Sequence, residues 1–449
     1  MIRFSRATHQ IASPRPRSAP AGGLAEPRNA YGRPFWLSYA SNLLVMVGVA
    51  LLYRYADFVT GLGGGEYKLG WIVGIGMIGS LATRLTIGAG IDRRGPRVVW
   101  LGSTALYVAV CLAHLAITNC DSPPIYLLRI VYCSALAGVF GASLTFVSGR
   151  APAARIAEMV GVVGTAGFLG QVLGTALGDL LIRGKTIEPW QTDLMFVVAA
   201  WLGLASMPLA YFATRHLPTP VRRERLALRD FLRKYNPGTV LVIAAAAGLG
   251  LCLPTTFLPT YIAELDIPRM GLFFGIYAPA AIITRVTTRR WPERFGPEPM
   301  ILLGVGGLVA SQLTFLLVSA EWQLLVPGIG YGIFHAILFP SVIAAGSRHA
   351  PEHHRGMATS LTLAVWDAGA LVGAPMAGAI VQYGGDAGLP PYPTMFLALG
   401  AVMLAAAVFY GLTCRRKAPL PHAVMPEPHG GRLAESGALA AVASADANA

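Results

Sequence analysis

The sequence TRLTIGAGIDRRGPR, residues 83–97, returns 201 positions later as TRVTTRRWPERFGPE, residues 284–298. Both copies begin with Thr-Arg-x-Thr, and both later carry an acidic residue, Arg, any residue, Gly and Pro in that order. Two separate matches at one offset make chance a poor explanation. We therefore infer that the chain consists of two related halves, each of which places this segment at an equivalent point.

The composition excludes a soluble globular protein. Of 449 residues, 54% are hydrophobic and 13% are charged, whereas an average soluble domain has about 25% charged residues. The 52 Gly and 32 Pro suit a chain with many membrane spans, because both residues are commoner in membrane helices than in soluble ones. We therefore do not take the net charge of +13 as a sign of nucleic-acid binding.

The apolar stretches predict an all-α integral membrane protein. A spanning helix needs about 20 mainly apolar residues, and twelve stretches qualify. They are residues 35–59, 69–91, 97–119, 124–148, 158–182, 192–214, 238–263, 270–288, 299–319, 322–346, 356–382 and 393–414. Because six spans return a chain to its starting side, we expect two six-helix bundles related by a parallel pseudo-two-fold axis.

Polar segments divide the chain into five parts. We predict a disordered basic cytoplasmic tail at 1–34, an N-terminal six-helix bundle at 35–214, a cytoplasmic linker at 215–237, a C-terminal six-helix bundle at 238–414 and a disordered cytoplasmic tail at 415–449. Both tails have too little apolar sequence to fold alone. The first tail also lacks the long apolar core of a cleaved signal peptide.

The basic residues orient the chain in the membrane. Outside the predicted spans, Lys and Arg fall almost entirely in the two tails and in the loops that follow even-numbered spans. The other loops hold only Lys68, Arg183, Lys185 and Arg269. Since cytoplasmic loops are enriched in Lys and Arg, we expect both termini in the cytoplasm of a multi-pass plasma (inner) membrane protein. We also expect it to be a monomer in the lipid bilayer.

The loop after the second span resembles the signature G-x-x-x-D-R-x-G-R-[RK] of the major facilitator superfamily of secondary transporters. The resemblance is carried by Gly88, Asp92, Arg93, Gly95 and Arg97, and in the second half by Glu293, Arg294 and Gly296. Pro96 stands where a basic residue is usual. In that family the acidic residue and the arginine latch neighbouring helix ends on the cytoplasmic side. Gly95 permits a tight turn, and a plain solvated turn is the alternative.

The fifth span resembles the antiporter signature G-x8-G-x3-G-P-x2-G-G of the same family. The pattern is carried by Gly161, Gly170, Gly174 and Gly178. Thr175 replaces the proline and Asp179 replaces the last glycine. Such glycines let helix backbones approach closely where the halves of a transporter pivot, and helix packing alone is the alternative. The subgroup that the chain most resembles is that of the twelve-span exporters of drugs and small metabolites.

Two ionisable residues lie near the middle of predicted spans, where a charge costs about 2.5–3.5 kcal/mol. Asp367, beside Trp366 in the eleventh span, is removed from water, which favours the protonated carboxyl that a proton carrier needs. His335, in the tenth span, can exchange a proton near neutral pH or hydrogen-bond a substrate. We predict proton coupling at both residues. The alternatives are an aspartate held by a nearby arginine and a histidine that only packs.

Tyr53, Arg54, Arg129 and Trp366 are predicted to line a substrate cavity. Arg54 shares a helix face with Asp57, so a local ion pair is the alternative. Arg129 resembles the arginine that proton-linked members of the family carry in the fourth span, although the Gln-Gly pair that usually follows is absent. Its alternative is a side chain that reaches out to the membrane interface. For the aromatic residues the alternative is packing.

Three further charges have expected partners. Arg84 and Arg285 are equivalent in the repeat, and repetition favours an architectural role, such as pairing with an acidic residue at a gate. Asp179 is followed one turn later by Arg183, which predicts an ion pair at the surface.

Together these features predict a secondary active transporter that exports a small organic molecule or drug in exchange for protons. The chain lacks the enzyme motifs HExxH and GxSxG, and its five cysteines lie singly, so we expect no catalysis, cofactor or metal site. One alternative is a proton-linked importer or facilitator of a sugar or organic anion, recognised by Arg54 and Arg129. Another is a non-transporting membrane sensor or assembly partner with the same fold.

Overall fold

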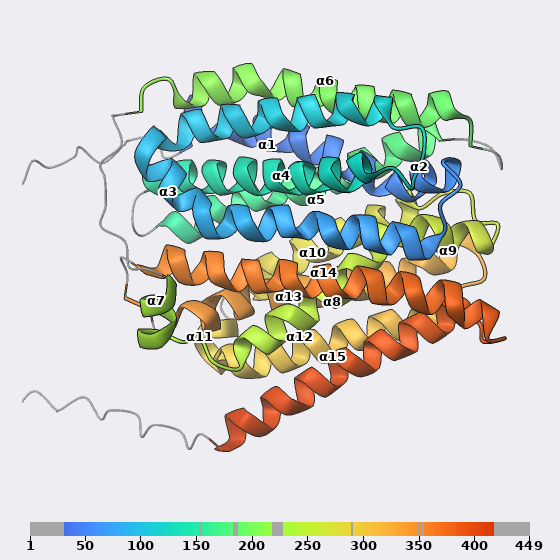
Figure 1. The fold of residues 1–449 in the computed structure, drawn as a ribbon. Coiled ribbons are helices and arrows are strands. Elements are labelled where there is room, and N and C mark those ends of the chain that lie inside the picture. The colour runs from blue at the N-terminus through green and yellow to red at the C-terminus, as the bar shows by residue number, and fades with distance from the viewer. Residues whose placement is uncertain are drawn as a thin grey trace, which may run out of the picture.

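A computed structural model describes residues 31–151, 155–182, 187–217, 228–288, 291–348, 350–351 and 354–416. In this part of the chain every regular element is a helix (Figure 1). The first half contains α1 (Arg33–Leu51), α2 (Tyr55–Gly61), α3 (Glu66–Ala113), α4 (Pro123–Arg150), α5 (Ile156–Leu181) and α6 (Pro189–Thr214). The second half contains α7 (Leu228–Lys234), α8 (Val240–Thr256), α9 (Leu258–Glu264), α10 (Gly271–Thr288), α11 (Trp291–Phe295), α12 (Pro297–Leu313), α13 (Leu325–Ser347), α14 (Arg355–Asp386) and α15 (Pro391–Arg416).

The helices confirm the predicted membrane spans. Among the described residues, eleven helical segments are long and apolar enough to cross a membrane, and the pair α8 and α9, which meet at 51°, gives a twelfth. α3 contains two of the spans, Glu66–Gly88 and Arg93–Ala116. Each predicted span agrees with an observed one to within four residues at either end. Length and hydropathy are local properties of the sequence, which is why they locate the spans so well.

The two loop signatures share one backbone conformation. φ is 80° at both Gly95 and Gly296, with ψ of 158° and 163°. Only glycine adopts this left-handed region without strain. The proline that follows each glycine fits the first turn of the next helix, where its missing N–H costs nothing. The predicted tight turn and the predicted repeat are therefore both present in the backbone.

The halves form two layers, with α1–α6 in the upper part of Figure 1 and α8–α15 in the lower part. They meet along two helix pairs, α3 with α14 and α5 with α10. At Gly70 and Gly378 a Cβ atom would collide with the backbone of the facing helix, so glycine is what permits this close approach. These two helix pairs are the main seams between the halves.

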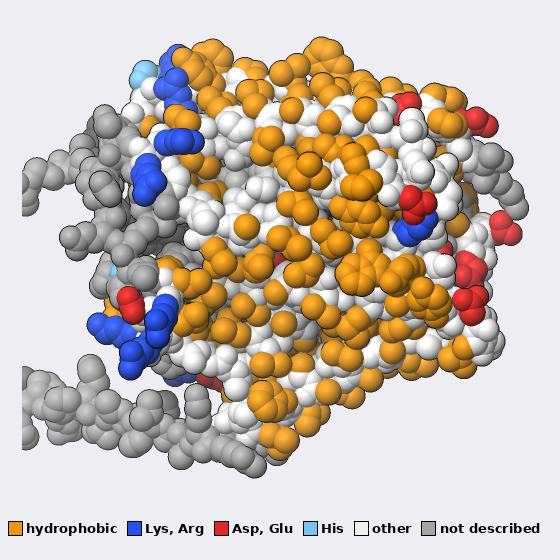
Figure 2. All heavy atoms as spheres, viewed as in Figure 1, with side chains coloured by type: hydrophobic (Ala, Val, Ile, Leu, Met, Phe, Trp, Pro, Cys, Tyr) orange, Lys and Arg blue, Asp and Glu red, His pale blue; other side chains and the backbone are white. Residues whose placement is uncertain are grey.

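Charge is separated between the two ends of the helices. Figure 2 shows Lys and Arg gathered at one end, Asp and Glu at the other, and a hydrophobic band between them. We call these the basic end and the acidic end. Arg215 follows α6 at the basic end, whereas Glu66 begins α3 and Glu188 precedes α6 at the acidic end.

The turn at Gly95 can be tested by adding a methyl group. Gly95→Ala is expected to lower the free energy of unfolding by about 1–2 kcal/mol, because a Cβ strains left-handed backbone. Gly102→Ala is the control, since Gly102 lies in regular helix and a Cβ there meets nothing within 4 Å. The readout is the midpoint of thermal unfolding in detergent, and equal midpoints for the two variants would contradict the strained turn.

Candidate functional site

Asp367 lies near the middle of α14 and contacts α3 across the seam between the halves. Its Oδ2 accepts hydrogen bonds from Arg84 Nε at 2.5 Å and from Ser80 Oγ at 2.6 Å. The side chain of Asp367 is 10% exposed and that of Arg84 is 25% exposed. Ser80 and Arg84 lie one turn apart on the same face of α3. A single carboxylate thus joins the two halves through charge-assisted hydrogen bonds.

This contact bears on two sequence hypotheses. Arg84 has the acidic partner that a gate role requires. Asp367 is held by an arginine, which is the alternative to a proton-carrier role. Because this ion pair joins the halves, a change in the protonation of Asp367 would change the contact between them. The proton-carrier role itself stays a prediction.

His335, in α13, lies within an aromatic cluster. Its Nδ1 and the Tyr277 hydroxyl form a hydrogen bond, and the two rings stack with centroids 6.0 Å apart. The centroids of Phe168, Trp366 and Phe339 lie 6.3, 6.3 and 5.9 Å from the imidazole. These five residues, the aromatic cluster, come from α5, α10, α13 and α14 and so from both halves. Within the described chain no hydrogen bond joins His335 to Asp367, the neighbour of Trp366 in the sequence.

Arg285, in α10, lies against this aromatic cluster. Its guanidinium carbon is 4.9 Å from the ring centroid of Phe168 and 6.0 Å from that of Phe339. Its Nε is buried without a hydrogen-bond partner, and the ion pairs between described residues do not include it. The acidic partner expected for Arg285 is therefore absent from the described structure. Arg285 differs in this from Arg84, its equivalent in the repeat.

Arg129, in α4, is held inside the first half by aromatic rings. Its guanidinium carbon is 4.4 Å from the ring centroid of Tyr55 and 4.8 Å from that of Tyr132, distances at which a cation is attracted to the ring faces. The aliphatic stem packs against α3, where a Cβ at Gly76 would lie 2.6 Å from Arg129 Cγ. The side chain is therefore packed within the bundle and does not reach out to the membrane interface.

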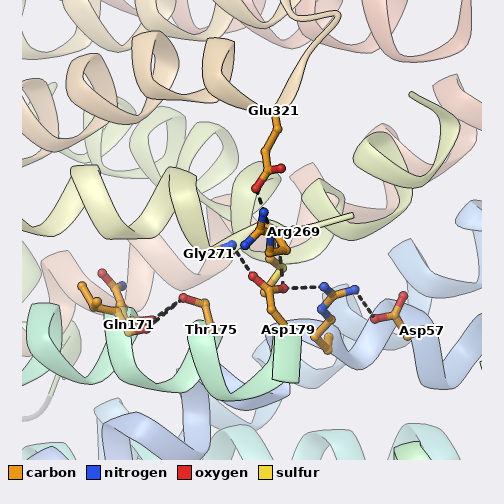
Figure 3. Close-up of polar contacts among 10 residues, drawn as sticks. Asp57, Gln171, Thr175, Asp179, Arg269, Gly271 and Glu321 are labelled. Carbon is orange, nitrogen blue, oxygen red and sulfur yellow. Dashed lines mark hydrogen bonds and ion pairs between the residues drawn. The ribbon is translucent and has the colours of Figure 1, made fainter. Parts of the chain in front are cut away.

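A second polar cluster lies at the acidic end (Figure 3). Arg54 Nη1 donates to Asp57 Oδ2 at 3.1 Å, and Arg54 Nη2 donates to Asp179 Oδ1. Asp179 also accepts hydrogen bonds from the backbone nitrogens of Gly271 at 2.7 Å and Met270 at 3.3 Å. The side chains of Arg54, Asp57 and Asp179 are 7%, 9% and 8% exposed. We refer to these residues as the acidic-end cluster.

The prediction that Asp179 lies at the surface is wrong, whereas its pairing with Arg183 stays a prediction. Its carboxylate is buried and binds Arg54 of the first span, 125 residues away, whereas Arg183 lies outside the described residues. Asp179 also caps the start of α10, where the helix dipole favours a negative charge. The carboxylate that replaces the last glycine of the antiporter pattern thus links α5 to the other half.

Arg54 and Tyr53 are the predicted cavity residues at this end, and Arg54 already binds other side chains. The guanidinium contacts two carboxylates, as the ion-pair alternative requires and with one more partner than the sequence indicated. Tyr53 contacts the other half, with its ring centroid 5.2 Å from that of Phe274. The Tyr53 hydroxyl accepts a hydrogen bond from Gln171 Nε2 at 3.2 Å.

The glycines of the fifth span pack α5 against α1. A Cβ at Gly170 or Gly174 would collide with the backbone of α1, and one at Gly178 would lie 3.2 Å from Arg54 Cγ. At Gly161 a Cβ meets nothing within 4 Å. Since α1 and α5 belong to the same half, these glycines hold one bundle together, and the expected location at a pivot between the halves is not what the structure shows.

The latch role of the loop signatures stays a prediction, because the side chains of Asp92 and Glu293 lie outside the described residues. Arg93 is exposed, and Arg97 places its guanidinium carbon 4.6 Å from the ring centroid of Tyr211 in α6. Arg294 lies over the ring of its neighbour Phe295 at 5.2 Å. Gly88 ends the second span.

Sequence reasoning missed Ser80, Phe168 and Tyr277. Ser80 carries a signal, because it lies one helical turn before Arg84 and so shares its face. Phe168 and Tyr277 look like ordinary aromatic residues of membrane spans, and nothing in the sequence brings them to His335.

Comparisons with known sequences identify a family and two similar proteins. The family model described as Major Facilitator Superfamily matches residues 35–320 and 240–442. The chain is 23% identical over 345 residues to the multidrug resistance protein MdtG of Enterobacter lignolyticus. This alignment covers 72% of this chain and 77% of that protein. It is 23% identical over 346 residues to MdtG of Salmonella typhimurium, with 73% and 80% covered.

Solved structures share the fold. A D-xylose-proton symporter superposes with a TM-score of 0.70 at 15% identity, covering 84% of this chain and 96% of that one. The nucleoside transporter NupG superposes with a TM-score of 0.67 at 12% identity, with 86% and 99% covered. These likenesses concern the fold alone, while the family model covers both halves of the sequence. The protein therefore belongs to the major facilitator superfamily of membrane transporters.

Proposed function

We propose that the protein exports a small organic molecule or drug in exchange for protons, by alternating access. The site lies between the halves, where the aromatic cluster and Asp367 draw on helices of both. Two relatives that carry the name multidrug resistance protein, each 23% identical, support export of this kind. The protein acts as a monomer in this proposal.

The contact between Asp367 and Arg84 is the observation that carries the proposal. It ties α14 to α3 through a charge that one proton removes. A protonated Asp367 no longer attracts the Arg84 guanidinium by charge, and in a medium of low dielectric constant this loss is large compared with the same loss in water. Proton binding therefore weakens the seam at this point and favours separation of the two helices. Proton movement and bundle movement are coupled in this way.

The acidic-end cluster supplies the second element that alternating access requires. Asp179 holds the start of α10 in the second half while it binds Arg54 in the first. At the same end of the helices, the Tyr67 backbone nitrogen donates to Gln382 Oε1 at 3.2 Å, which joins α3 to α14. These contacts must break when the site opens toward the acidic end. We propose that they form the outer gate.

The orientation follows from the charge separation in Figure 2. Basic residues favour the cytoplasmic side of a membrane, so the proposal places the basic end and both termini in the cytoplasm and the acidic end outside. The membrane is the plasma (inner) membrane.

Removing the titratable group tests the coupling. Asp367→Asn is expected to abolish transport driven by a pH gradient while leaving substrate exchange intact, because the amide keeps the shape of the side chain but carries no proton to the other side. The measurement uses proteoliposomes and the compound that intact cells export best in a screen. Asp193→Asn, at an exposed position on α6, is the control and is expected to transport normally.

The same assay separates the alternatives. Undiminished pH-driven flux in Asp367→Asn would place the coupling elsewhere. The direction of flux under an imposed gradient distinguishes an exporter from a proton-linked importer or facilitator. Absence of flux for every compound would favour a sensor or assembly partner that does not transport.

The outer gate is tested by a crosslink. In a cysteine-free background, Tyr67→Cys and Gln382→Cys are expected to crosslink readily across the acidic end. Adding Asp179→Ala is expected to shift the closed-to-open ratio by about ten-fold toward the open state, since charge-assisted hydrogen bonds are lost. Asp193→Asn is again the control, and an unchanged crosslinked fraction with Asp179→Ala would exclude the gate role.

The orientation has its own test. Green fluorescent protein fused after residue 449 is expected to fluoresce, because it folds in the cytoplasm. The same reporter fused after Asp266, beyond the seventh span, is expected to stay dark. The opposite pattern would reverse the proposed orientation.

A further inference from the structure

We propose that the central site binds an organic anion, with Arg285 as the residue that pairs with the negative group of the substrate and the aromatic cluster as the surface that holds its apolar body. This inference rests on the proposed transport function and names the substrate class of the same site. It differs from the sequence-based alternative, which assigned anion recognition to Arg54 and Arg129.

Arg285 has no carboxylate partner among the described residues. Its Nε is buried without a hydrogen-bond partner, and rings are its close neighbours. Contact with ring faces compensates a guanidinium only partly, whereas a paired carboxylate or similar anion forms two parallel hydrogen bonds with it. The residue keeps part of its surface exposed. An anionic group of a ligand is therefore the partner that Arg285 still lacks.

The repeat indicates where a carboxylate equivalent to Asp367 would lie in the first half. Arg84 and Arg285 are equivalent at an offset of 201, while α5 and α14 match at an offset of 200, as Arg155 and Arg355 illustrate. The equivalent of Asp367 in α5 is thus Gly167, which has no side chain. Arg285 does lie against this turn of α5, since a Cβ at Gly164 would be 3.1 Å from its Nη1.

The hydroxyl that assists Asp367 is missing from the second half as well. The equivalent of Ser80 is Ala281, a buried residue of α10. The two seams thus consist of equivalent helices but differ in their polar side chains. At α3 and α14 the arginine, the carboxylate and the hydroxyl satisfy one another, whereas at α5 and α10 the arginine alone remains.

The charge and shape of the site also favour an anion. Asp367 is already engaged by Arg84 and Ser80, so it leaves Arg285 as the uncompensated charge beside the aromatic cluster. A cationic substrate would be repelled there. Phe168 and Phe339 suit a flat apolar body. If the Tyr277 hydroxyl donates to His335 Nδ1, the Nε2 of His335 carries a hydrogen and becomes a further donor to the anion.

Three probes with one naphthalene body test the inference: naphthoate, naphthamide and naphthylmethylammonium. We expect the purified protein in detergent to bind naphthoate at least about ten-fold more tightly than the neutral amide, as a charge-assisted pair requires. The ammonium probe is expected to bind most weakly. Calorimetric titration needs no gradient, so this result is independent of transport.

Two kinds of variant localise the effect. Arg285→Gln is expected to weaken naphthoate about ten-fold while leaving naphthamide unchanged, and Arg285→Lys is expected to restore part of the affinity. Gly167→Asp supplies the carboxylate that the repeat lacks and is expected to weaken naphthoate to a similar extent. Gly167→Asn has nearly the same shape without the charge and is the matched control. A Cβ at Gly167 meets nothing within 4 Å, so neither variant clashes at its Cβ.

The outcomes are distinct. Unchanged naphthamide binding shows that each variant is folded. Equal affinity of the wild-type protein for naphthoate and naphthamide, or naphthoate binding that Arg285→Gln and Gly167→Asp leave unchanged, would overturn the anion site. If naphthoate binds as expected but a pH gradient drives no flux in proteoliposomes, the proposed proton coupling fails while the anion site stands.

Discussion

A charge inside a bilayer needs a compensating partner, and this requirement determines how the helices of the protein contact one another. Among the described spans, Arg54, Arg84, Arg129 and Arg285 are compensated in three different ways and to different degrees. Arg54 and Arg84 bind carboxylates of other helices, and Arg129 lies between two tyrosine rings of its own half. Arg285 has phenyl rings only. Each solution fixes one helix against another, because a long side chain that leaves its partner exposes a charge to an apolar medium.

Two of the compensating carboxylates also decide how the halves are joined. Asp367 binds Arg84 near the middle of the membrane, while Asp179 binds Arg54 and the start of α10 at the acidic end. Around them the seams consist largely of glycine and apolar side chains in close contact. Such surfaces contribute packing without directional bonds, so they tolerate relative movement of the halves. The few directional contacts are therefore the ones that select a conformation.

The sequence predicts the features that depend on residues close together in the chain. It does not predict the contacts between residues that are far apart in the chain. The spans follow from local hydropathy, and the turns at Gly95 and Gly296 follow from a pattern repeated within a few positions. Proximity in sequence predicts Arg183 as the partner of Asp179, but it does not predict Arg54, which lies 125 residues away and binds Asp179 in the described structure. Asp367 and Arg84 are 283 residues apart. Each was recognised singly as a charge inside a span, but periodicity carries no signal that pairs them.

The repeat explains both the likeness of the halves and the difference that a transporter needs. The turns at Gly95 and Gly296 have nearly the same backbone conformation, which is the likeness. A perfectly repeated seam, however, would place an arginine and a carboxylate on both sides of the site and leave no charge for a substrate. In this chain Asp367 has no counterpart at Gly167. In the proposed mechanism the proton acts at the seam of α3 and α14, whereas the substrate acts at the seam of α5 and α10. The movement of the halves then couples the two, and they do not compete for one residue.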